Sequence, residues 1–317
     1  MAVYTDITQL QLEDYLKDFN IGKLVSFTGI ASGVENTNYF VTTTQKTFVL
    51  TIFEKRVDEK DLPFFLNLMN HLSDKKISCP QVIKNTSGET LHTIADKPSI
   101  IISFLKGGDI KTVTADACRQ IGEITARMHM AVVDFTEMRK NTLGLDGWKD
   151  LYNSTKSKMS DELASIVSTE LAHQDTHKKD TLPKGIIHAD LFTDNVFFEN
   201  GELTGVIDFY FASTDSFAYD LAINITAWCF VDDFDQLNLE CASAMLRGYQ
   251  SVRPLNADEI SSINTLARGA SIRFLLTRYY DQINTCANAK VHIKDHSEYV
   301  RKLKFYQTFD FQSAGIL

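Results

Sequence analysis

No run of apolar residues in the sequence approaches the roughly 20 that a membrane-spanning helix needs. The first residues, MAVYTDITQL, contain neither a basic start nor an apolar core, so we expect no secretory signal. Cysteine is scarce, and its 5 residues, an odd number without C-x-x-C spacing, indicate free thiols rather than a disulfide framework. These absences predict a cytoplasmic protein that does not span a membrane and does not depend on disulfides.

Positive charge is also in short supply. Lysine and arginine number 32 against 41 aspartate and glutamate residues, which gives a formal net charge of −9. This balance argues against nucleic acid as a partner, although a local basic cluster can still bind a small anion. The apolar fraction of 44% and the charged fraction of 23% are typical of a globular protein, and 317 residues allow one large or two ordinary domains.

Strand-like segments dominate the first third of the chain. Apolar or alternating runs predict strands at 24–28, 39–43, 47–53, 77–83, 89–94 and 99–105, with helices at 8–19 and 58–73. The composition changes at Lys106-Gly107-Gly108-Asp109, and helical spacing prevails beyond it, including helices at 114–133 and 146–171. We therefore predict an α+β fold of two lobes, a small β-rich lobe at 1–105 and a large, mostly α-helical lobe at 106–317.

The stretch HADLFTDNVFFENGELTGVIDFYF, residues 188–211, carries the densest set of polar candidates. Asp190 and Asn195 have the D-x-x-x-x-N spacing of a kinase catalytic loop, in which the aspartate receives a hydroxyl proton and the asparagine holds a metal ion. His188 is expected to hold the loop backbone in place. His129, near the end of the helix at 114–133, is likewise expected to be a structural hydrogen-bonding residue.

A hairpin is predicted directly after this loop. Segments 196–198 and 203–207 are strand-like, and Asn200-Gly201 between them is the preferred sequence of a type I′ turn. The hairpin would carry Asp208 back beside Asn195, in the place of the metal-binding aspartate of a kinase D-F-G motif. Carboxylate and amide oxygens suit Mg²⁺, which binds few protein groups when phosphates supply the others.

The segment GIASGVENTNY, at 29–39, lies between two predicted strands and combines two glycines with small polar residues. Such a loop can lay backbone N–H groups over phosphates, although an ordinary hairpin turn would have a similar composition. The end of the strand at 99–105 would be the joint between the lobes and would present backbone groups to an adenine edge. The candidate nucleotide-binding residues are Ser32, Gly33, Asn36 and Thr37 in the loop and Ser103 and Leu105 at the joint.

Strings spread over about residues 29–278 carry a resemblance to a known family. They are SGVENTNYF, FVLTIFEKR, LPFFLNLMNHL, ARMHMA, GIIHADLFTDNVFF, GVIDFYFA and YDLAINITAWC. The chain resembles the aminoglycoside-phosphotransferase-like branch of the protein-kinase-like superfamily and, within it, the bacterial homoserine kinases. The resemblance implies a two-lobed protein-kinase-like fold, ATP and Mg²⁺ as cofactors, and phosphorylation of the L-homoserine hydroxyl in threonine biosynthesis.

One position departs from the kinase pattern. FVLT places Thr51 where related strands carry a lysine that grips the phosphates of ATP, as in V-A-I-K. Lys55 and Arg56 lie just beyond it and are candidates to replace that lysine. The glutamate that would pair with the lysine, at Glu59, is in doubt for the same reason.

The implied substrate is a zwitterion, so its site needs donors for a carboxylate and an acceptor for an ammonium group. Asp220 follows the predicted hairpin closely and is the candidate for the ammonium group. Arg273 and Arg278 are candidates for the carboxylate. They point about 140° apart on one helix at about 100° per residue, so we do not expect them to serve one site together.

Other functions remain open on the sequence alone. The chain could be a kinase for another small hydroxylated substrate, such as an aminoglycoside or choline, because the fold does not choose the substrate. It could be a nucleotide-binding module without activity, which the missing lysine favours and the catalytic-loop residues disfavour. His188 and Asp190 with His292 or His296 would suit an iron site, but such sites usually lie in a double-sheet barrel. Oligomeric state is not set by the sequence.

Overall fold

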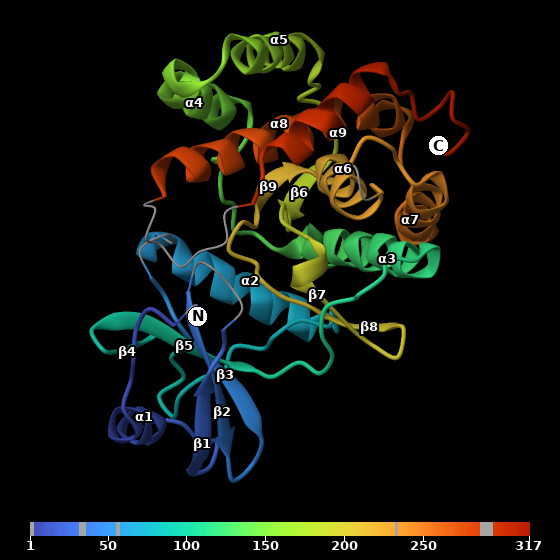
Figure 1. Cartoon of the computed structure of the whole chain (residues 1–317). Helices are drawn as coiled ribbons and strands as arrows, with labels where there is room; N and C mark the ends of the chain where they lie inside the picture. Colours follow the sequence, from blue (N-terminus) through green and yellow to red (C-terminus); the bar gives the residue numbers. More distant parts are fainter. Residues whose placement is uncertain (1–2, 32–35, 55–57, 232–233, 286–293) are drawn as a thin grey trace. The chain divides into compact units, whose positions relative to one another are not determined.

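A computed structural model describes residues 3–31, 36–54, 58–231, 234–285 and 294–317. The chain forms two compact units (Figure 1). The first consists mainly of Met1–Gly107 and Gly205–Tyr210, and the second of Gly108–Thr204, Phe211–Ala287 and His292–Leu317. The predicted α+β class is confirmed, because strands form most of the first unit and helices most of the second. The assignment of nucleotide binding to 1–105 and of catalysis to 106–317 stays a prediction.

A five-stranded antiparallel sheet forms the centre of the first unit, in the order β1-β2-β3-β5-β4. Its strands are β1 (Leu24–Gly29), β2 (Thr37–Thr43), β3 (Thr47–Ile52), β4 (His92–Ile94) and β5 (Lys97–Ser103). Alternate residues of β2 are buried, as the period of a strand requires. Tyr39 and Val41 pack in one core with Leu12 and Leu16 of helix α1 (Gln9–Leu16), so that α1 covers this face of the sheet.

Helix α2 (Leu62–Asp74) follows a 3₁₀ turn (Glu59–Asp61) and has its proline in the first turn, where the missing N–H costs nothing. Its Phe65 packs edge-on against Tyr210, at 5.6 Å between ring centroids. The predicted strand at 77–83 is wrong. Only Val82 forms a bridge, to Ile102, and Pro80 in this segment has no N–H to give to a ladder.

Helices dominate the second unit (Figure 1). In the described part of the chain they are α3 (Ala115–Ala131), α4 (Leu145–Thr155), α5 (Asp161–His177), α6 (Phe217–Trp228), α7 (Leu239–Val252), α8 (Ala257–Asn284) and α9 (Ser297–Thr308). The single helix predicted at 146–171 is two helices, because Ser160 caps the start of α5 by accepting the N–H of Leu163. No helix among the described residues is both long and apolar enough to cross a membrane.

Four short strands frame the central stretch. β6 (Lys184–Ile187) pairs antiparallel with β9 (Ser213–Ser216), a pair that the sequence did not predict. β7 (Val196–Glu199) and β8 (Glu202–Val206) form the predicted hairpin. Its turn residues Asn200 and Gly201 have φ of 53° and 86°, positive at both central positions as a type I′ turn requires.

Helices α3 and α7 lie in unusually close contact. A Cβ atom added at Gly122 of α3 would lie 2.0 Å from the carbonyl oxygen of Met245, and one at Gly248 of α7 would lie 2.1 Å from that of Arg119. Neither position has room for a side chain, so the two helix backbones touch. This contact brings the end of α3 against the side chains of α7.

Candidate active site

The loop predicted to be catalytic lies between β6 and β7 in the second unit. Asp190 and Asn195 are brought together, because the amide nitrogen of Asn195 donates to the carbonyl oxygen of Asp190 at 2.8 Å and to its carboxylate at 3.4 Å. Asn195 is buried, whereas the side chain of Asp190 keeps 19% of its surface exposed. The loop thus leaves the carboxylate of Asp190 partly exposed to solvent, and the printed bonds of Asn195 to Asp190 use its amide nitrogen and leave out its amide oxygen.

Backbone strain accompanies this arrangement. Ala189, the residue before Asp190, has a φ of 66°, a left-handed conformation that costs a non-glycine residue about 1 kcal/mol or more. Both of its peptide groups are held: its N–H donates to Asp220 at 2.8 Å, and its carbonyl accepts from Arg273. Such strain persists only where the surroundings fix it, and here it fixes the position of Asp190, the next residue.

Two further bonds hold the loop. The N–H of Asp190 donates to Nδ1 of His188 at 3.2 Å, so the expectation that His188 supports the backbone is confirmed. The indole N–H of Trp228, at the end of α6, donates to the carbonyl of Leu191 at 2.7 Å. Side chains therefore bond the loop at consecutive residues.

Asp220 is fully buried in the first turn of α6. Its carboxylate accepts the N–H of His188 at 3.0 Å, that of Ala189 at 2.8 Å and Nε2 of His129 at 3.0 Å. Burial acts to raise the pKa of Asp220, but the hydrogen bonds from His129 and from the loop backbone outweigh it, so the pKa is lowered. The group predicted to bind a substrate ammonium is already occupied by the loop and by α3.

The two candidate arginines of α8 have different surroundings. Arg273 is buried, and its guanidinium lies over the ring of Phe274 and 3.8 Å from the carboxylate of Asp190. Arg278 pairs with Glu298 of α9 and donates to the carbonyl of Asp295 at 3.0 Å. Of the pair, Arg273 is the one that reaches the catalytic loop.

The end of the predicted phosphate loop is tied down within the first unit. The hydroxyl of Thr37 accepts the N–H groups of Tyr4 and Thr5 and donates to Glu54, which also forms an ion pair with Lys97. The Asn36 side chain accepts the N–H of Glu54 at 3.3 Å. Ser32, Gly33, Lys55 and Arg56 lie outside the described residues.

Thr51 is the fifth of the six residues of β3, at the position where related strands carry a phosphate-binding lysine. It is buried, and its hydroxyl donates to the side chain of Asn38 at 2.7 Å. This pair lies on the face of β2 and β3 opposite to the core under α1, because Tyr39 and Leu50, their strand neighbours, point into that core.

The predicted joint between the lobes, with Ser103 and Leu105, lies at the end of β5. The N–H and hydroxyl of Ser103 are both bonded to the backbone of Gln81, each at 2.9 Å. Leu105 is partly buried. Beside them, Phe40 and Phe104 are 39% and 42% exposed, and their rings meet edge to face at 5.8 Å. Neither aromatic was predicted from the sequence. For Phe40 the signal is the alternation of β2, which places it on the exposed side of the strand.

Asp208 belongs to the first unit, whereas Asp190 and Asn195 belong to the second, so the predicted convergence of the three stays a prediction. Asp208 has a φ of 65°, an uncommon conformation for a residue other than glycine. Within the described ranges, no group of three or more His, Cys, Asp or Glu side chains could hold a metal ion. That result disfavours the iron site for His188, Asp190 and His296; His292 lies outside the described residues.

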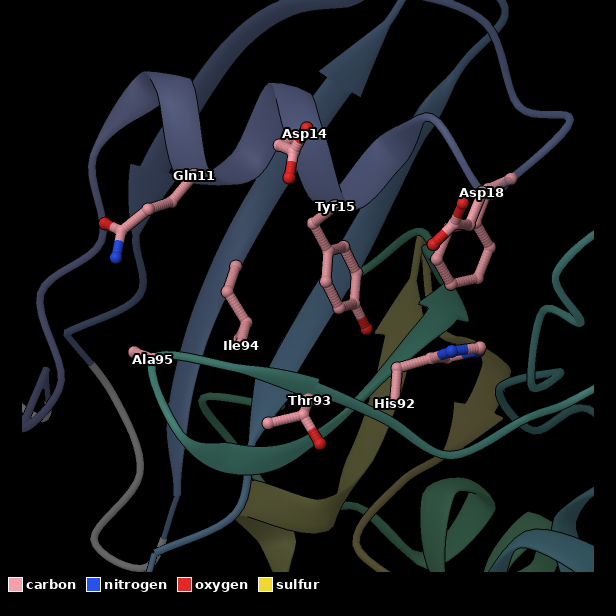
Figure 2. Close-up of a pocket in the computed structure, with 9 residues that line it drawn as sticks. Gln11, Asp14, Tyr15, Asp18, His92, Thr93, Ile94 and Ala95 are labelled. Atoms are coloured by element: carbon pink, nitrogen blue, oxygen red, sulfur yellow. The ribbon is translucent and has the colours of Figure 1, made fainter.

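A pocket of about 320 Å³ opens elsewhere in the first unit (Figure 2). Figure 2 shows side chains of α1 on one side of it and those of β4 and the following turn on the other. Its lining residues are Gln11, Asp14, Tyr15, Asp18, Phe19, His92, Thr93, Ile94 and Ala95. None of the residues predicted to bind nucleotide or substrate is among them.

The chain matches the model of the phosphotransferase enzyme family over residues 26–255. It is 47% identical over 310 residues to a homoserine kinase of Azorhizobium caulinodans, covering 97% of this chain and 96% of the relative. It is 46% identical over 316 residues to a homoserine kinase of Paramagnetospirillum magneticum, with 97% of each covered.

Solved structures show the same fold at low identity. An amicoumacin kinase in complex with AMP-PNP, Ca²⁺ and Ami superposes with a TM-score of 0.72 at 15% identity, covering 97% of each chain. A spectinomycin phosphotransferase in complex with ADP and spectinomycin gives a TM-score of 0.67 at 15% identity, covering 96% of each. With the family model and the near full-length relatives, these likenesses place the chain in the phosphotransferase enzyme family, among the homoserine kinases.

Proposed function

We propose that the chain transfers the γ-phosphoryl group of ATP to the side-chain hydroxyl of L-homoserine and so forms O-phospho-L-homoserine, a step of threonine biosynthesis in the cytoplasm. The observation that carries the proposal is the strained loop that presents Asp190 beside Asn195, held by Asp220, Arg273 and Trp228. Phosphoryl transfer asks the protein mainly for positioning and charge stabilisation, which a clamped loop supplies.

Asp190 is proposed to bind the hydroxyl group of the substrate. Its exposed carboxylate would accept a hydrogen bond from that hydroxyl and receive its proton as the new P–O bond forms. Arg273, 3.8 Å away, stabilises the carboxylate in its charged form by its own positive charge.

Asn195 and Asp208 are the residues that would hold Mg²⁺. The donor set fits, because an amide oxygen and a carboxylate are hard oxygen ligands, and the bonds of Asn195 to Asp190 use its nitrogen rather than its oxygen. When bound, the ion neutralises negative charge on the phosphates. The first unit would bind the nucleotide through residues 1–105.

Within the first unit, Asn36 and Thr37 fix one end of the loop at 29–39, whose N–H groups, with Ser32 and Gly33, would contact phosphates. Phe40 and Phe104 offer exposed aromatic surface next to Ser103 and Leu105, where an adenine ring would stack. Thr51 is bonded to Asn38, so a basic group to replace the lysine would have to come from Lys55 or Arg56, which lie outside the described residues. Without them, loop N–H groups and the metal ion would neutralise the phosphates.

For the substrate carboxylate we retain Arg273 as the first candidate, because it is the arginine that reaches Asp190. Arg278 is the second candidate, and it would have to leave Glu298. Asp220 would have to release two loop N–H groups to bind an ammonium group, so we assign it a positioning role first.

A substrate panel tests the proposal. Purified protein with ATP and Mg²⁺ is given homoserine, serine, threonine, choline or an aminoglycoside, and the products are identified by phosphorus NMR. We expect O-phosphohomoserine as the main product. Efficient turnover of another substrate without homoserine turnover would instead support the second candidate, a kinase for a different small alcohol. Nucleotide binding without any product would support a module without activity.

A further inference from the structure

A chain of buried hydrogen bonds runs from the catalytic loop away from the site. Asp220, which holds the loop N–H groups of His188 and Ala189, receives Nε2 of His129 at 3.0 Å. Nδ1 of His129 lies 2.8 Å from the hydroxyl of Tyr249 on α7. The side chain of His129 and that of Asp220 are both fully buried, so water does not compete for these bonds.

Two of the donors in this hydrogen-bond chain are set by the chemistry of its ends. A carboxylate can only accept, so His129 donates from Nε2 to Asp220. Arg253 can only donate, and it gives a hydrogen bond to the oxygen of Tyr249 at 3.1 Å. With a neutral imidazole, which carries its hydrogen on Nε2 to donate to Asp220, the tyrosine O–H is directed to Nδ1 of His129.

The end of this hydrogen-bond chain at Arg253 is held by further bonds. Arg253 forms an ion pair with Glu259 at 2.8 Å, and Glu259 is 1% exposed. Glu259 in turn exchanges hydrogen bonds with Asn256 in the capping box at the start of α8. The glycine contact between α3 and α7, at Gly122 and Gly248, sets the distance between His129 and Tyr249. The ring of His129 is also stacked on Phe217, with ring centroids 4.5 Å apart.

We propose that His129 is a positioning residue for phosphoryl transfer, which acts through Asp220 on the strained backbone of Ala189 and so on Asp190, with Tyr249 fixing its tautomer. Ala189 relaxes if its N–H is released, and Asp190 is the next residue. The donor from His129 keeps one oxygen of Asp220 from turning away from the loop. The inference rests on the proposed function for its rate measurements and is independent of it for its exchange measurements.

The test compares His129→Leu, which removes the donor, with His129→Gln, whose amide nitrogen can replace Nε2. Glu170→Gln is the matched control, since Glu170 is fully buried, accepts hydrogen bonds from Arg268 and Gln174, and has no bond to the loop. We expect His129→Leu to lower kcat about tenfold or more, with KM for ATP and homoserine within about twofold of wild type. His129→Gln should recover kcat to within about threefold of wild type.

A double-mutant cycle separates positioning from general destabilisation. If His129 acts through Asp220, then His129→Leu should cause no further loss of kcat in the Asp220→Asn background. Tyr249→Phe should give a smaller loss than His129→Leu because it keeps the donor to Asp220. If the losses of kcat from His129→Leu and Asp220→Asn multiply in the double variant, the proposal is overturned. A His129→Gln variant as impaired as His129→Leu would also overturn it.

Amide exchange reports on the loop without any turnover. Followed by mass spectrometry at peptides covering 186–192, the amides of His188 and Ala189 should exchange about tenfold faster in His129→Leu and at the wild-type rate in Glu170→Gln. Equal exchange in all three proteins would contradict the positioning role even if kcat fell. If wild type does not phosphorylate homoserine, the proposed function fails while the exchange result still decides this inference.

Discussion

Asp190 is distinguished from its neighbours by what surrounds it rather than by its residue type. Asp194, in the same loop, is 54% exposed and pairs with Lys294 at 3.2 Å. Asp190 instead follows a strained alanine and lies beside Asn195 and Arg273. The two aspartates therefore provide a matched pair for testing which carboxylate serves the reaction.

Replacing Asp190 by Asn removes the proposed proton acceptor and keeps the shape of the side chain. We expect kcat to fall at least about 100-fold while ATP affinity is retained, because general-base assistance commonly contributes that much or more. Steady-state rates and calorimetric ATP binding measure the two quantities. Asp194→Asn should behave as wild type in both; near-normal turnover of Asp190→Asn would remove Asp190 from the mechanism.

Asp208 is expected to act through the metal ion. Asp208→Ala should abolish turnover and weaken nucleotide binding only when Mg²⁺ is present, because in the proposed role the lost carboxylate would bind the ion and not the nucleotide. ATP titrations with and without Mg²⁺ give both affinities. Glu202→Ala, in the hairpin that precedes Asp208 and exposed, is the control. Superimposable metal titration curves for wild type and Asp208→Ala would show the assignment to be wrong.

Variants of the two α8 arginines test which of them binds the substrate carboxylate. Arg273→Ala should lower kcat/KM for homoserine by about 100-fold, since an unpaired buried charge costs a few kcal/mol, with little change in ATP affinity. Arg278→Ala should mainly lower thermal stability through its lost ion pair with Glu298. A rise in the homoserine KM of Arg278→Ala alone would transfer the role to Arg278, whereas a pure kcat loss in Arg273→Ala would assign Arg273 to the loop.

At the level of elements, the contact of α3 with α7 leaves no space for a methyl group. Gly122→Ala should lower the free energy of unfolding by about 3 kcal/mol, because the new Cβ would meet the carbonyl of Met245 and the helices would have to separate. Denaturant unfolding measures the loss. Gly108→Ala is the control, as no atom lies within 4 Å of its added Cβ. An unchanged midpoint for Gly122→Ala would mean that the helices separate without cost.

Helix α9 is joined to α6 by a buried lysine. Lys302 donates to the carbonyl of Thr226 at 2.9 Å and to Glu298 at 2.6 Å, and the rings of Phe230, Phe234 and Tyr299 surround its ammonium group. Burial lowers the pKa of Lys302 from 10.5 to about 8, although Glu298 acts to raise it. The folded protein therefore releases this proton before the unfolded chain does.

The sign of the resulting pH dependence follows from proton counting. Between about pH 8 and 10.5 the unfolded chain binds more protons at Lys302, so its contribution to stability improves as pH rises, by up to about 3 kcal/mol. We expect the unfolding free energy of wild type minus that of Lys302→Met to increase from pH 7.5 to 9.5. Groups remote from Lys302 cancel in this difference, and burial raises the pKa of Cys229, on which the charge of Lys302 acts, well above its usual value. A difference that is flat or falls with pH would contradict the lowered pKa.

For the whole molecule, the features that the sequence predicted are those that depend on residues close together in the chain. The hairpin was predicted because Asn200 and Gly201 favour positive φ, and the loop because Asp190 and Asn195 lie five residues apart. The antiparallel pair β6–β9 was missed because its strands are four residues each and lie 26 positions apart, too short for a pattern to show. The break between α4 and α5 depends on one serine cap.

The candidate site was predictable to the same extent. The spacing of the loop identified Asp190, and His129 was correctly expected to be a structural hydrogen-bonding residue. Nothing local indicates that Tyr249, 120 positions further on, is its partner, or that Asp220 holds the loop. Partners of this kind are set by helix packing, which a single sequence does not display.

The first unit takes up the segment Gly205–Tyr210 although the chain has by then passed through nearly a hundred residues of the second. Val206 donates to the carbonyl of Ser78, and Tyr210 packs on Phe53 and Phe65. No single crossover between two related genes can therefore exchange the first unit intact. A chimera joined after Gly107 would combine the sheet of one parent with the Tyr210 segment of the other, so the surfaces of Phe53 and Phe65 and that segment must be inherited together.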